Sequence, residues 1–338
     1  MTDTEQVHPT DSVALSVSVA MCTHNGARFI EAQLHSILSQ TLPPQQLVLS
    51  DDDSSDATVQ LVTEMVEEYR EHHPLDFVVF RNMPALGVAR NFEQAILACT
   101  GDLIALSDQD DAWVTERLAV VAARFEREPE LSLVHCDARL IDEQGGALDA
   151  ALFDSLGVSD WERETEQTAD ALKVLLRRNI VTGATTVFRR ELASRAMPIP
   201  EGWIHDEWLA VVAAAVGRIG IEPRQLVDYR QHDANQIGAG KLSFRQKLDK
   251  LMQPRRDRNR TLLLRSQHLA PRLQHLGAEP RLIALAEYKA RHEAFRSRLP
   301  ANRLLRVVPV LVRAAAGWYR RYGMGPQDVL RDLVQPAG

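Results

Sequence analysis

Three clusters of polar residues follow short apolar runs of the sequence. They are Thr23–Asn25, Asp51–Asp53 and Asp108–Asp111. Carboxylates that converge repel one another unless a cation lies between them. Hard oxygen ligands favour Mg²⁺ or Mn²⁺, which typically bind one or two carboxylates together with a substrate diphosphate. The residue types therefore predict a divalent-metal site that also binds a nucleotide diphosphate.

Helix capping is the alternative interpretation of both acidic clusters. Asp and Ser side chains accept hydrogen bonds from the free amides at a helix N-terminus. On this interpretation Asp51–Asp56 ends a strand and begins a helix, and Asp108–Asp111 caps a helix that begins near Val114. Because the two clusters follow equivalent strands, a shared capping role is the weaker explanation.

Apolar runs alternate with amphipathic patterns over the first 136 residues. The predicted strands are Leu15–Met21, Gln46–Ser50, Phe77–Phe80, Asp102–Ser107 and Leu131–Cys136. The predicted helices are Ala27–Gln40, Thr58–Arg70, Val88–Cys99 and Thr115–Arg127. Strands that alternate with such helices form right-handed βαβ units and a mainly parallel sheet. Ligands bind beyond the carboxyl ends of such strands, which is where the three polar clusters lie.

The alternating pattern weakens in the second part of the chain. The segment Asp137–Asp170 is rich in Asp, Glu, Gly and Ser and predicts a flexible loop. Strands are predicted again at Gly183–Phe188 and Leu226–Tyr229, with a helix at Asp206–Val216 between them. We therefore divide the chain into a loose leader (1–14), an α/β domain (15–240) with halves 15–136 and 137–240, and a basic helical region (241–338).

The composition is that of an ordinary globular protein, with 45% hydrophobic and 25% charged residues in 338. A net charge of −7 argues against a uniformly basic nucleic-acid-binding protein. The charge is unevenly distributed, because residues 241–338 hold 21 Lys and Arg against 7 Asp and Glu. The cysteines Cys22, Cys99 and Cys136 form no paired motif, which indicates buried thiols in a reducing compartment.

Several motifs are absent from the sequence, and their absence narrows the chemistry. There is no GxxxxGK[ST] phosphate loop, no GxGxxG after the first predicted strand and no GxSxG. The N-terminal residues form no signal peptide, and no apolar run reaches the ~20 residues that span a bilayer. A P-loop enzyme, a dinucleotide dehydrogenase and a serine hydrolase are therefore disfavoured, and we expect a cytoplasmic protein.

Seven sequence stretches carry a family resemblance. SVAMCTHNGARFIEAQLHSILSQT, LSDDDSSD, NMPALGVARNFEQAI and LIALSDQDDAW resemble the donor-binding half of a family-2 glycosyltransferase. VTGATTVFRREL, WIHDEWLAVVAA and YRQHDANQIG resemble the bacterial rhamnosyltransferase-like branch that builds O-antigen and other surface polysaccharides. The resemblance spans about Val17 to Gly238. It implies an α/β fold of the GT-A type, with one Rossmann-like sheet that is mainly parallel and mixed on the acceptor side, and a helical C-terminal extension.

The resemblance also implies roles for individual residues, with 15–136 as the donor half and 137–240 as the acceptor half. The expected nucleotide-sugar ligands are Thr23, Asn25, Asp51, Asp52, Arg90 and Asp108. Asp110 or Asp111 would bind Mg²⁺ or Mn²⁺, and His232 would be a further contact to the metal or the diphosphate. Asp206 aligns with the catalytic base of the family. The chain departs from the family pattern at Asp53, where glycine is usual, and at Asp233, where a small residue is usual.

Other interpretations remain open on the acceptor side. Asp206 could cap a helix, His232 could be a structural histidine, and Glu207 is the rival base. Trp203 and Trp208 are candidates for sugar stacking, but core packing is the more usual role for such residues. The best prediction is inverting transfer of L-rhamnose from dTDP-L-rhamnose to a glycan or lipid-linked glycan. A UDP-sugar donor, or a non-catalytic scaffold of a polysaccharide-assembly complex, is the alternative.

The segment Leu304–Tyr322 is apolar with flanking arginines. A basic amphipathic segment with Trp318 and two tyrosines is suited to the headgroup region of an anionic membrane. Peripheral attachment to the inner face of the bacterial plasma membrane would bring the protein to a lipid-linked acceptor. Packing on the catalytic domain or on a second copy in a homo-oligomer is an equal alternative. Nucleic-acid binding is disfavoured, because aromatic residues are sparse among the basic ones.

Overall fold

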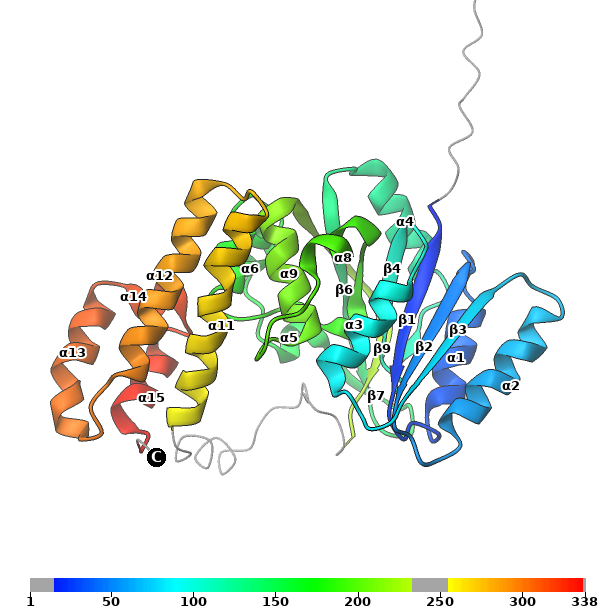
Figure 1. The fold of residues 1–338 in the computed structure, drawn as a ribbon, viewed down its shortest axis with the longest axis horizontal. Coiled ribbons are helices and arrows are strands. Elements are labelled where there is room, and N and C mark those ends of the chain that lie inside the picture. The colour runs from blue at the N-terminus through cyan, green and yellow to red at the C-terminus, as the bar shows by residue number, and fades with distance from the viewer. Residues whose placement is uncertain (1–14, 233–254, 337–338) are drawn as a thin grey trace, which may run out of the picture.

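The computed structural model describes residues 15–232 and 255–336 (Figure 1). The predicted leader over 1–14, the predicted domain boundary near residue 240 and the departure at Asp233 lie outside the described residues. One mixed sheet of nine strands forms the centre of the α/β part, with helices on both faces. The C-terminal helices extend from one end of this part (Figure 1).

The first half of the sheet is parallel. Its spatial order is β3 (Asp76–Asn82), β2 (Gln46–Asp52), β1 (Val17–Thr23) and β4 (Leu103–Ser107). Thr23 pairs with Asp51, and Met21 pairs with Ser107, so β1, β2 and β4 end at one edge. The prediction that the polar clusters follow neighbouring strand ends is confirmed.

The second half of the sheet is mixed, as expected from the resemblance. β8 (Thr186–Arg189) runs antiparallel to both β4 and β6 (Leu131–Ile141). β9 (Arg218–Arg230) pairs parallel with β6 and antiparallel with the short β5 (Ala112–Trp113). The long β9 thereby brings its C-terminal end to the segment that follows β4.

Each face of the sheet has its own apolar core, because successive strand residues point to opposite faces. In β1, Ala20 and Cys22 join one core and Val19 and Met21 join the other. One face is covered by α1 (Ile30–Leu38), α2 (Thr58–Arg70) and α4 (Arg117–Arg127), and the other by α3 (Val88–Ala98), α8 (Arg190–Ala196) and α9 (His205–Val216). All three cysteines are buried and free, as predicted.

The prediction of a flexible loop at Asp137–Asp170 is wrong. This segment completes β6 and then forms β7 (Ala147–Ala151), α5 (Leu152–Ser155) and α6 (Asp160–Glu166), before α7 (Ala171–Leu175). Several of its polar residues accept hydrogen bonds from local backbone amides and so stabilise this structure. Asp137 accepts from the amides of Ala138 and Phe153, and Ser159 forms a capping box with Glu162.

The C-terminal region is helical, as predicted. It consists of α11 (Arg255–His275), α12 (Pro280–Ser297), α13 (Arg303–Ala315), α14 (Trp318–Tyr322) and α15 (Pro326–Val334). Leu269 and Leu273 of α11 and Leu282 of α12 join the core that contains Trp208 of α9. The bundle is therefore attached to the α/β part through shared apolar packing. No helix within 15–232 or 255–336 is long and apolar enough to cross a membrane.

The segment Leu304–Tyr322 is not one continuous amphipathic helix. It breaks at Gly317, whose φ of 79° is in the left-handed region, between α13 and α14. Tyr319 and Tyr322 are buried, and the Arg313 guanidinium lies 3.8 Å from the ring centroid of Trp318. The two tyrosines therefore pack inside the helical bundle, as the packing alternative expects, and the largely exposed apolar residues of this segment lie on α13.

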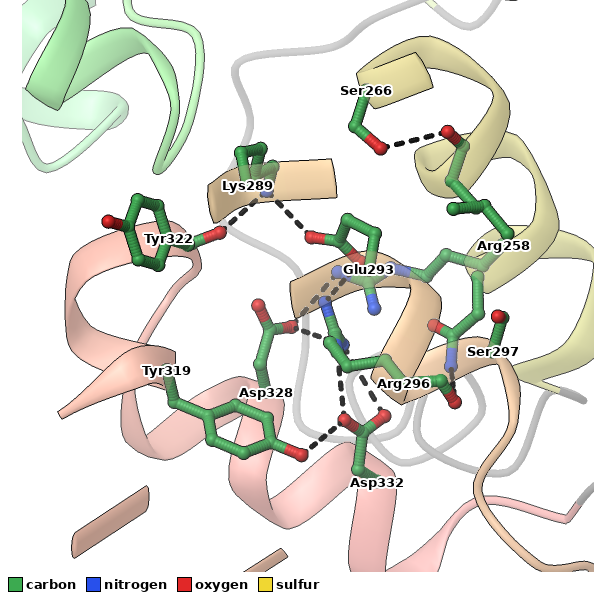
Figure 2. A network of polar contacts seen from close by, with 12 residues as sticks. Arg258, Ser266, Lys289, Glu293, Arg296, Ser297, Tyr319, Tyr322, Asp328 and Asp332 are labelled. Atoms are coloured by element: carbon green, nitrogen blue, oxygen red, sulfur yellow. Dashed lines mark hydrogen bonds and ion pairs between the residues drawn. The ribbon is translucent and has the colours of Figure 1, made fainter. Parts of the chain in front are cut away.

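A buried ionic network holds the C-terminal helices together (Figure 2). Arg296 of α12 is 1% exposed and forms ion pairs with Glu293 at 3.2 Å, Asp328 at 3.3 Å and Asp332 at 2.8 Å. Asp332 also accepts a hydrogen bond of 2.8 Å from the Tyr319 hydroxyl. Burial opposes ionisation of Asp328, but Arg296 and the neighbouring arginines hold the pKa of its carboxyl below the ordinary value. Figure 2 shows Arg296 reaching from α12 to both carboxylates of α15.

Replacing Arg296 with methionine is expected to destabilise the C-terminal helices by about 3–5 kcal/mol, because it leaves buried carboxylates uncompensated. Thermal unfolding followed by circular dichroism measures the loss. Arg298→Met is the matched control, because Arg298 is the exposed C-cap residue of the same helix. Equal unfolding temperatures for the two variants would contradict the assignment of this network as the main polar link within the bundle.

Candidate functional site

The first two polar clusters are joined by hydrogen bonds at the ends of β1 and β2. The Thr23 hydroxyl donates to Asp51 at 2.6 Å, and Asp51 also accepts from the amide and hydroxyl of Ser54. Asn25 adopts a φ of 50° and accepts from the Ser55 amide at 2.9 Å. Thr23 and Asp51 are buried, and Asn25 is exposed. The structure thus brings these three predicted residues together and leaves Asn25 at the surface.

Asp52 connects the end of β2 with the loop that precedes α3. Its carboxylate accepts from the amides of Leu86 at 2.6 Å and Gly87 at 2.8 Å. Gly87 has a φ of 83°, a conformation that favours glycine and presents its amide to Asp52. Arg90 lies one turn later on α3, half-exposed and ion-paired with Glu93 at 2.7 Å. Asp52 therefore fixes the loop that leads into α3, the helix that carries Arg90.

The third cluster is contacted by the C-terminal end of β9. The Oδ2 of Asp110 lies 2.8 Å from the Nε2 of His232, across 122 positions of sequence. Asp111 accepts from the Arg230 amide at 3.0 Å, and the Arg230 side chain donates to the Asp110 carbonyl at 2.7 Å. The ring of His232 stacks on Phe29 with centroids 5.1 Å apart. The structure therefore brings Asp110 and His232 into direct contact, and Asp111 faces the protein interior.

The carboxylates of this region perturb one another. Burial, followed by the charges of Asp110 and Asp206, raises the pKa of Asp108 to about 7. Burial and the charges of Asp110 and Asp108 also raise the pKa of Asp111 well above its ordinary value. Clustered carboxylates with raised pKa values are typical of functional sites, because a folded protein otherwise avoids such repulsion.

Arg117 is a component of the site that the sequence analysis missed. It is fully buried in α4, with its guanidinium carbon 3.9 Å from the ring centroid of Trp113. None of its three guanidinium nitrogens has a hydrogen-bond partner among the described residues. Burial lowers the pKa of Arg117 to about 10, and the nearby acidic groups of Cys136, Asp111 and Asp108 oppose this shift. Arg117 is thus a buried cation beside the acidic cluster, and the only sequence signal was its position four residues after Trp113.

Asp206 lies in the first turn of α9, behind the acidic cluster. Its Oδ2 accepts from the Gly183 amide at 3.0 Å and its Oδ1 from the Glu207 amide at 2.6 Å. Burial raises the pKa of Asp206 to about 6, against the lowering effect of these amides. Ile204, and not Asp206, is the N-cap residue of α9. The Asp206 side chain is buried, with the residue 8% exposed. Both of its carboxylate oxygens are held in place by backbone amides.

His205 precedes Asp206 and stays uncharged. Its ring stacks on Phe92 with centroids 3.8 Å apart, and burial lowers its pKa to about 3. Both ring nitrogens are buried, without a hydrogen-bond partner among the described residues. Sequence reasoning missed this residue, because a stack between α3 and α9 leaves no local pattern. The neutral ring adds no positive charge beside Asp206.

The remaining acceptor-side candidates differ in their surroundings. Trp208 is fully buried and donates to the Ala196 carbonyl at 2.6 Å, so it is a core residue. Trp203 donates to the Arg265 carbonyl at 3.0 Å and contacts the Arg265 guanidinium through its ring. Glu207 forms an ion pair with Arg265 of α11. Of these residues, Glu207 is the one that links Asp206 to the C-terminal helices.

A divalent cation was predicted for this site. Within the part of the chain that the structure describes, no group of three or more His, Cys, Asp or Glu side chains is spaced to hold a metal ion. The Asp110 and His232 pair offers one carboxylate oxygen and one imidazole nitrogen at 2.8 Å. Mg²⁺ sites commonly consist of one or two protein ligands, waters and substrate phosphates. This donor pair therefore fits a cation that is shared with a diphosphate.

Comparisons with a family model and with known sequences give several matches. The family model described as glycosyl transferase family 2 matches residues 18–195. The chain is 28% identical to the uncharacterized protein Rv1520 of Mycobacterium tuberculosis over 64% of its length and 59% of that protein. It is 25% identical to the uncharacterized glycosyltransferase alr2836 of Nostoc sp. over 65% of its length and 66% of that protein. The chain thus spans less than two thirds of these relatives.

A further relative has a stated activity. It is the Escherichia coli enzyme WfgD, a UDP-Glc:alpha-D-GlcNAc-diphosphoundecaprenol beta-1,3-glucosyltransferase. The chain is 32% identical to it over 102 residues, which are 30% of this chain and 38% of the enzyme.

Solved structures share the fold over most of the chain. Staphylococcus aureus TarS (1–349) in complex with UDP-GlcNAc gives a TM-score of 0.57 at 17% identity, covering 93% of this chain and 83% of TarS. The mannosyltransferase PcManGT of Pyrobaculum calidifontis, in complex with GDP-Man and Mn²⁺, gives a TM-score of 0.50 at 18% identity. The match covers 90% of this chain and 77% of PcManGT. At these identities the likeness establishes the fold alone.

Proposed function

The chain belongs to glycosyl transferase family 2, and on this premise we propose that it transfers a sugar from a nucleotide-sugar to a glycan acceptor in bacterial surface-polysaccharide synthesis. The observation that carries the proposal is the convergence of Asp108, Asp110 and Asp206 at the edge where β1, β2 and β4 end. A scaffold protein has no need of mutually repelling carboxylates at this edge, so an enzyme is the better conclusion.

The donor proposed first is dTDP-L-rhamnose, and a UDP-sugar is the alternative. The resemblance of the segments around Asp206 and His232 to rhamnosyltransferase-like enzymes supports the first donor. The UDP-sugars in the names of TarS and WfgD support the alternative. Thermal-shift measurements with dTDP, UDP and GDP in the presence of Mn²⁺ test the choice. Stabilisation by dTDP alone supports the rhamnosyl donor, whereas stabilisation by UDP alone replaces it with the alternative.

In the proposed mechanism Asp206 is the general base. Its carboxylate accepts the proton of an acceptor hydroxyl while that oxygen bonds to the anomeric carbon of the donor sugar. The bond between this carbon and the diphosphate oxygen breaks, and the electron pair leaves with the nucleoside diphosphate. Attack from the opposite face inverts the anomeric configuration. A raised pKa of about 6 strengthens Asp206 as a base and still leaves it ionised at neutral pH.

Asp110 and His232 are the residues proposed to hold Mg²⁺ or Mn²⁺. The bound cation would neutralise the negative charge that develops on the leaving diphosphate. Thr23, Asn25, Asp51 and Asp52 form the proposed nucleotide side of the site, with Asp108 between them and Asp206. Arg90 is a candidate contact to the phosphates once it leaves its exposed ion pair with Glu93.

The proposed acceptor is a lipid-linked glycan, reached by attachment to an anionic membrane surface. Helix α13 carries an apolar stripe whose members are Leu304, Leu305, Val308 and Val312, between 64% and 81% exposed. Arginines at both ends of α13, Arg303 and Arg313, suit it to anionic headgroups. This arrangement supports insertion of one helix face into a membrane surface.

Replacing Val308 with aspartate is expected to weaken binding to phosphatidylglycerol vesicles about 10-fold, because a valine that would insert among the lipids is exchanged for a charge that anionic lipids repel. Co-sedimentation at low salt measures the binding. Leu97→Asp is the control, because Leu97 is 59% exposed on α3 and lies outside the stripe. If the unaltered protein binds no vesicles, the membrane proposal fails and the stripe is assigned to contact with a second copy, which sedimentation analysis detects.

A further inference from the structure

Two adjoining cavities lie where the α/β part meets the C-terminal helices. The smaller, of about 110 Å³, lies between α9 and α11 and is lined by Trp203, Glu207 and Arg265, among others. The larger, of about 790 Å³, is lined by residues of α6, α7, α12 and α14. Leu176 and Arg177 line both cavities. A path of cavities therefore leads from Glu207, the neighbour of Asp206, to the C-terminal helices.

The cations that line these cavities fall into two groups. Four are neutralised by carboxylates, in the pairs Lys173–Asp170, Arg178–Glu162, Arg265–Glu207 and Lys289–Glu293. The others are Arg177, Arg320 and Arg321, and the described residues offer them no ion pair. The Nε of Arg177 is also buried without a hydrogen-bond partner in the described part of the chain. The larger cavity thus presents three uncompensated guanidinium groups.

Apart from these three arginines, Ser159 and the ion-paired Lys173, the larger cavity is lined by apolar and aromatic residues. Trp161, Leu176, Leu285 and Tyr322 contribute to its lining, which contains no Asp or Glu among the described residues. Trp161 is 46% exposed, and the Arg177 guanidinium lies 4.7 Å from its ring centroid. The volume of the larger cavity, about 790 Å³, is that of a ligand pocket for a molecule of moderate size. The chemistry of the lining therefore matches a ligand with a strongly anionic head and an apolar chain.

We propose that the larger cavity binds the diphosphate and the first isoprenyl units of a polyprenyl-diphosphate-linked acceptor. This inference rests on the proposed function and names the acceptor class and its binding residues. Arg177, Arg320 and Arg321 contact the diphosphate oxygens, because guanidinium groups form paired, charge-assisted hydrogen bonds with phosphates. Trp161 and Leu285 contact the isoprenyl chain. The sugar on the diphosphate then extends into the smaller cavity, towards Glu207 and Asp206.

Calorimetric titration of the full chain with farnesyl diphosphate tests this site without any sugar transfer. EDTA is included, so that a metal at Asp110 does not capture the diphosphate. We expect binding to the unaltered protein, and about 10-fold weaker binding for Arg177→Gln and for Arg320→Gln, since each loses a charge-assisted contact. Arg70→Gln is the matched control, because Arg70 is an exposed arginine of α2, and α2 lies at the opposite end of the molecule from the C-terminal helices (Figure 1). Circular dichroism establishes that each variant is folded.

The ligand series separates the possible sources of binding. Farnesyl diphosphate is expected to bind more tightly than inorganic diphosphate or farnesol, since each of these lacks one half of the proposed ligand. Equal affinity for inorganic diphosphate would overturn the isoprenyl part of the proposal. Equal competition by dihexanoyl phosphatidylglycerol would assign the cavity to phospholipid headgroups and overturn it. Unchanged affinity in the Arg177 and Arg320 variants would place the diphosphate elsewhere.

The same measurements keep this inference distinct from the proposed function. A protein that binds farnesyl diphosphate through Arg177 but releases no nucleoside diphosphate from any donor retains the site and loses the proposed activity. A protein that transfers sugar to an acceptor without a diphosphate, at the same rate in the Arg177→Gln and Arg320→Gln variants as in the unaltered protein, retains the activity and loses the site.

Discussion

Asparagine at position 206 is expected to lower the rate of sugar transfer by at least about 100-fold while leaving donor affinity unchanged. Asparagine has the size of aspartate and accepts hydrogen bonds through one oxygen, so the bond from the Gly183 amide can persist. It cannot accept a proton from the acceptor hydroxyl. The rate is measured as release of nucleoside diphosphate from a dTDP-sugar or UDP-sugar in the presence of acceptor glycan, and donor affinity is measured by calorimetry.

Glu207→Gln is the matched control for this variant. Glu207 is the adjacent carboxylate, but it forms an ion pair with Arg265 on the side of α11. We expect this variant to lose much less activity than Asp206→Asn. If Glu207→Gln is inactive and Asp206→Asn transfers at the rate of the unaltered protein, the base has been assigned to the wrong one of two adjacent residues. If both variants are active, the base lies elsewhere.

The pH dependence of transfer follows from the same assignment. A general base acts in its deprotonated form, and burial raises the pKa of Asp206 to about 6. Activity is therefore expected to be level above this pH and to fall about tenfold for each unit below it. In the Asp206→Asn variant, the fall in the transfer rate below about pH 6 should be absent. A fall that begins only near pH 4, the ordinary range of an aspartate, would contradict the role of a buried Asp206.

Alanine at position 110 is expected to abolish the dependence of nucleoside diphosphate binding on a divalent cation. Asp110 is half of the pair proposed to hold the cation, and its contact with His232 is 2.8 Å long. The variant should bind nucleoside diphosphate in Mn²⁺ only as weakly as the unaltered protein does in EDTA. Calorimetric titrations in Mn²⁺ and in EDTA measure both affinities.

The matched control for Asp110→Ala is Asp53→Asn. Asp53 is an exposed carboxylate after β2 with a φ of 66°, a conformation that asparagine tolerates. This variant should keep the response to Mn²⁺, because Asp53 is not part of the Asp108–Asp111 cluster that contains the proposed metal ligand. Equal affinity of the unaltered protein in Mn²⁺ and EDTA would remove the metal from the mechanism. His232→Ala should weaken the response to Mn²⁺ as well, since it removes the second proposed ligand.

The order of the elements in the first half of the chain was predictable because each rests on local patterning. Helix α2 has the predicted bounds of Thr58–Arg70, since its apolar spacing is regular. The segment after Cys136 was mispredicted, because composition does not reveal that the Asp137 carboxylate accepts from the Phe153 amide at the start of α5 and the Glu162 carboxylate accepts from the Ser159 amide at the start of α6. Polar residues in such local structures have the same composition as a loop.

The candidate site was predictable to the extent that its residues follow strands. The register of β1 with β2 and β4 brings the three polar clusters to one edge, as expected. The contact between Asp110 and His232 depends on the path of β9, which spacing alone does not determine. Arg117 was missed because its burial beside Trp113 is a property of packing between α4 and the sheet. Trp208 likewise became a core residue through tertiary packing.

Proton NMR of the reaction tests the central claim most directly. The unaltered protein is incubated with a nucleotide-sugar, Mn²⁺ and an acceptor glycan, and the anomeric signals of donor and product are followed with time. Transfer through Asp206 as a base predicts a glycoside of inverted anomeric configuration, formed in step with nucleoside diphosphate. A product with retained configuration would contradict the mechanism. No product from a donor that calorimetry shows to be bound would contradict the enzyme itself and favour a non-catalytic scaffold.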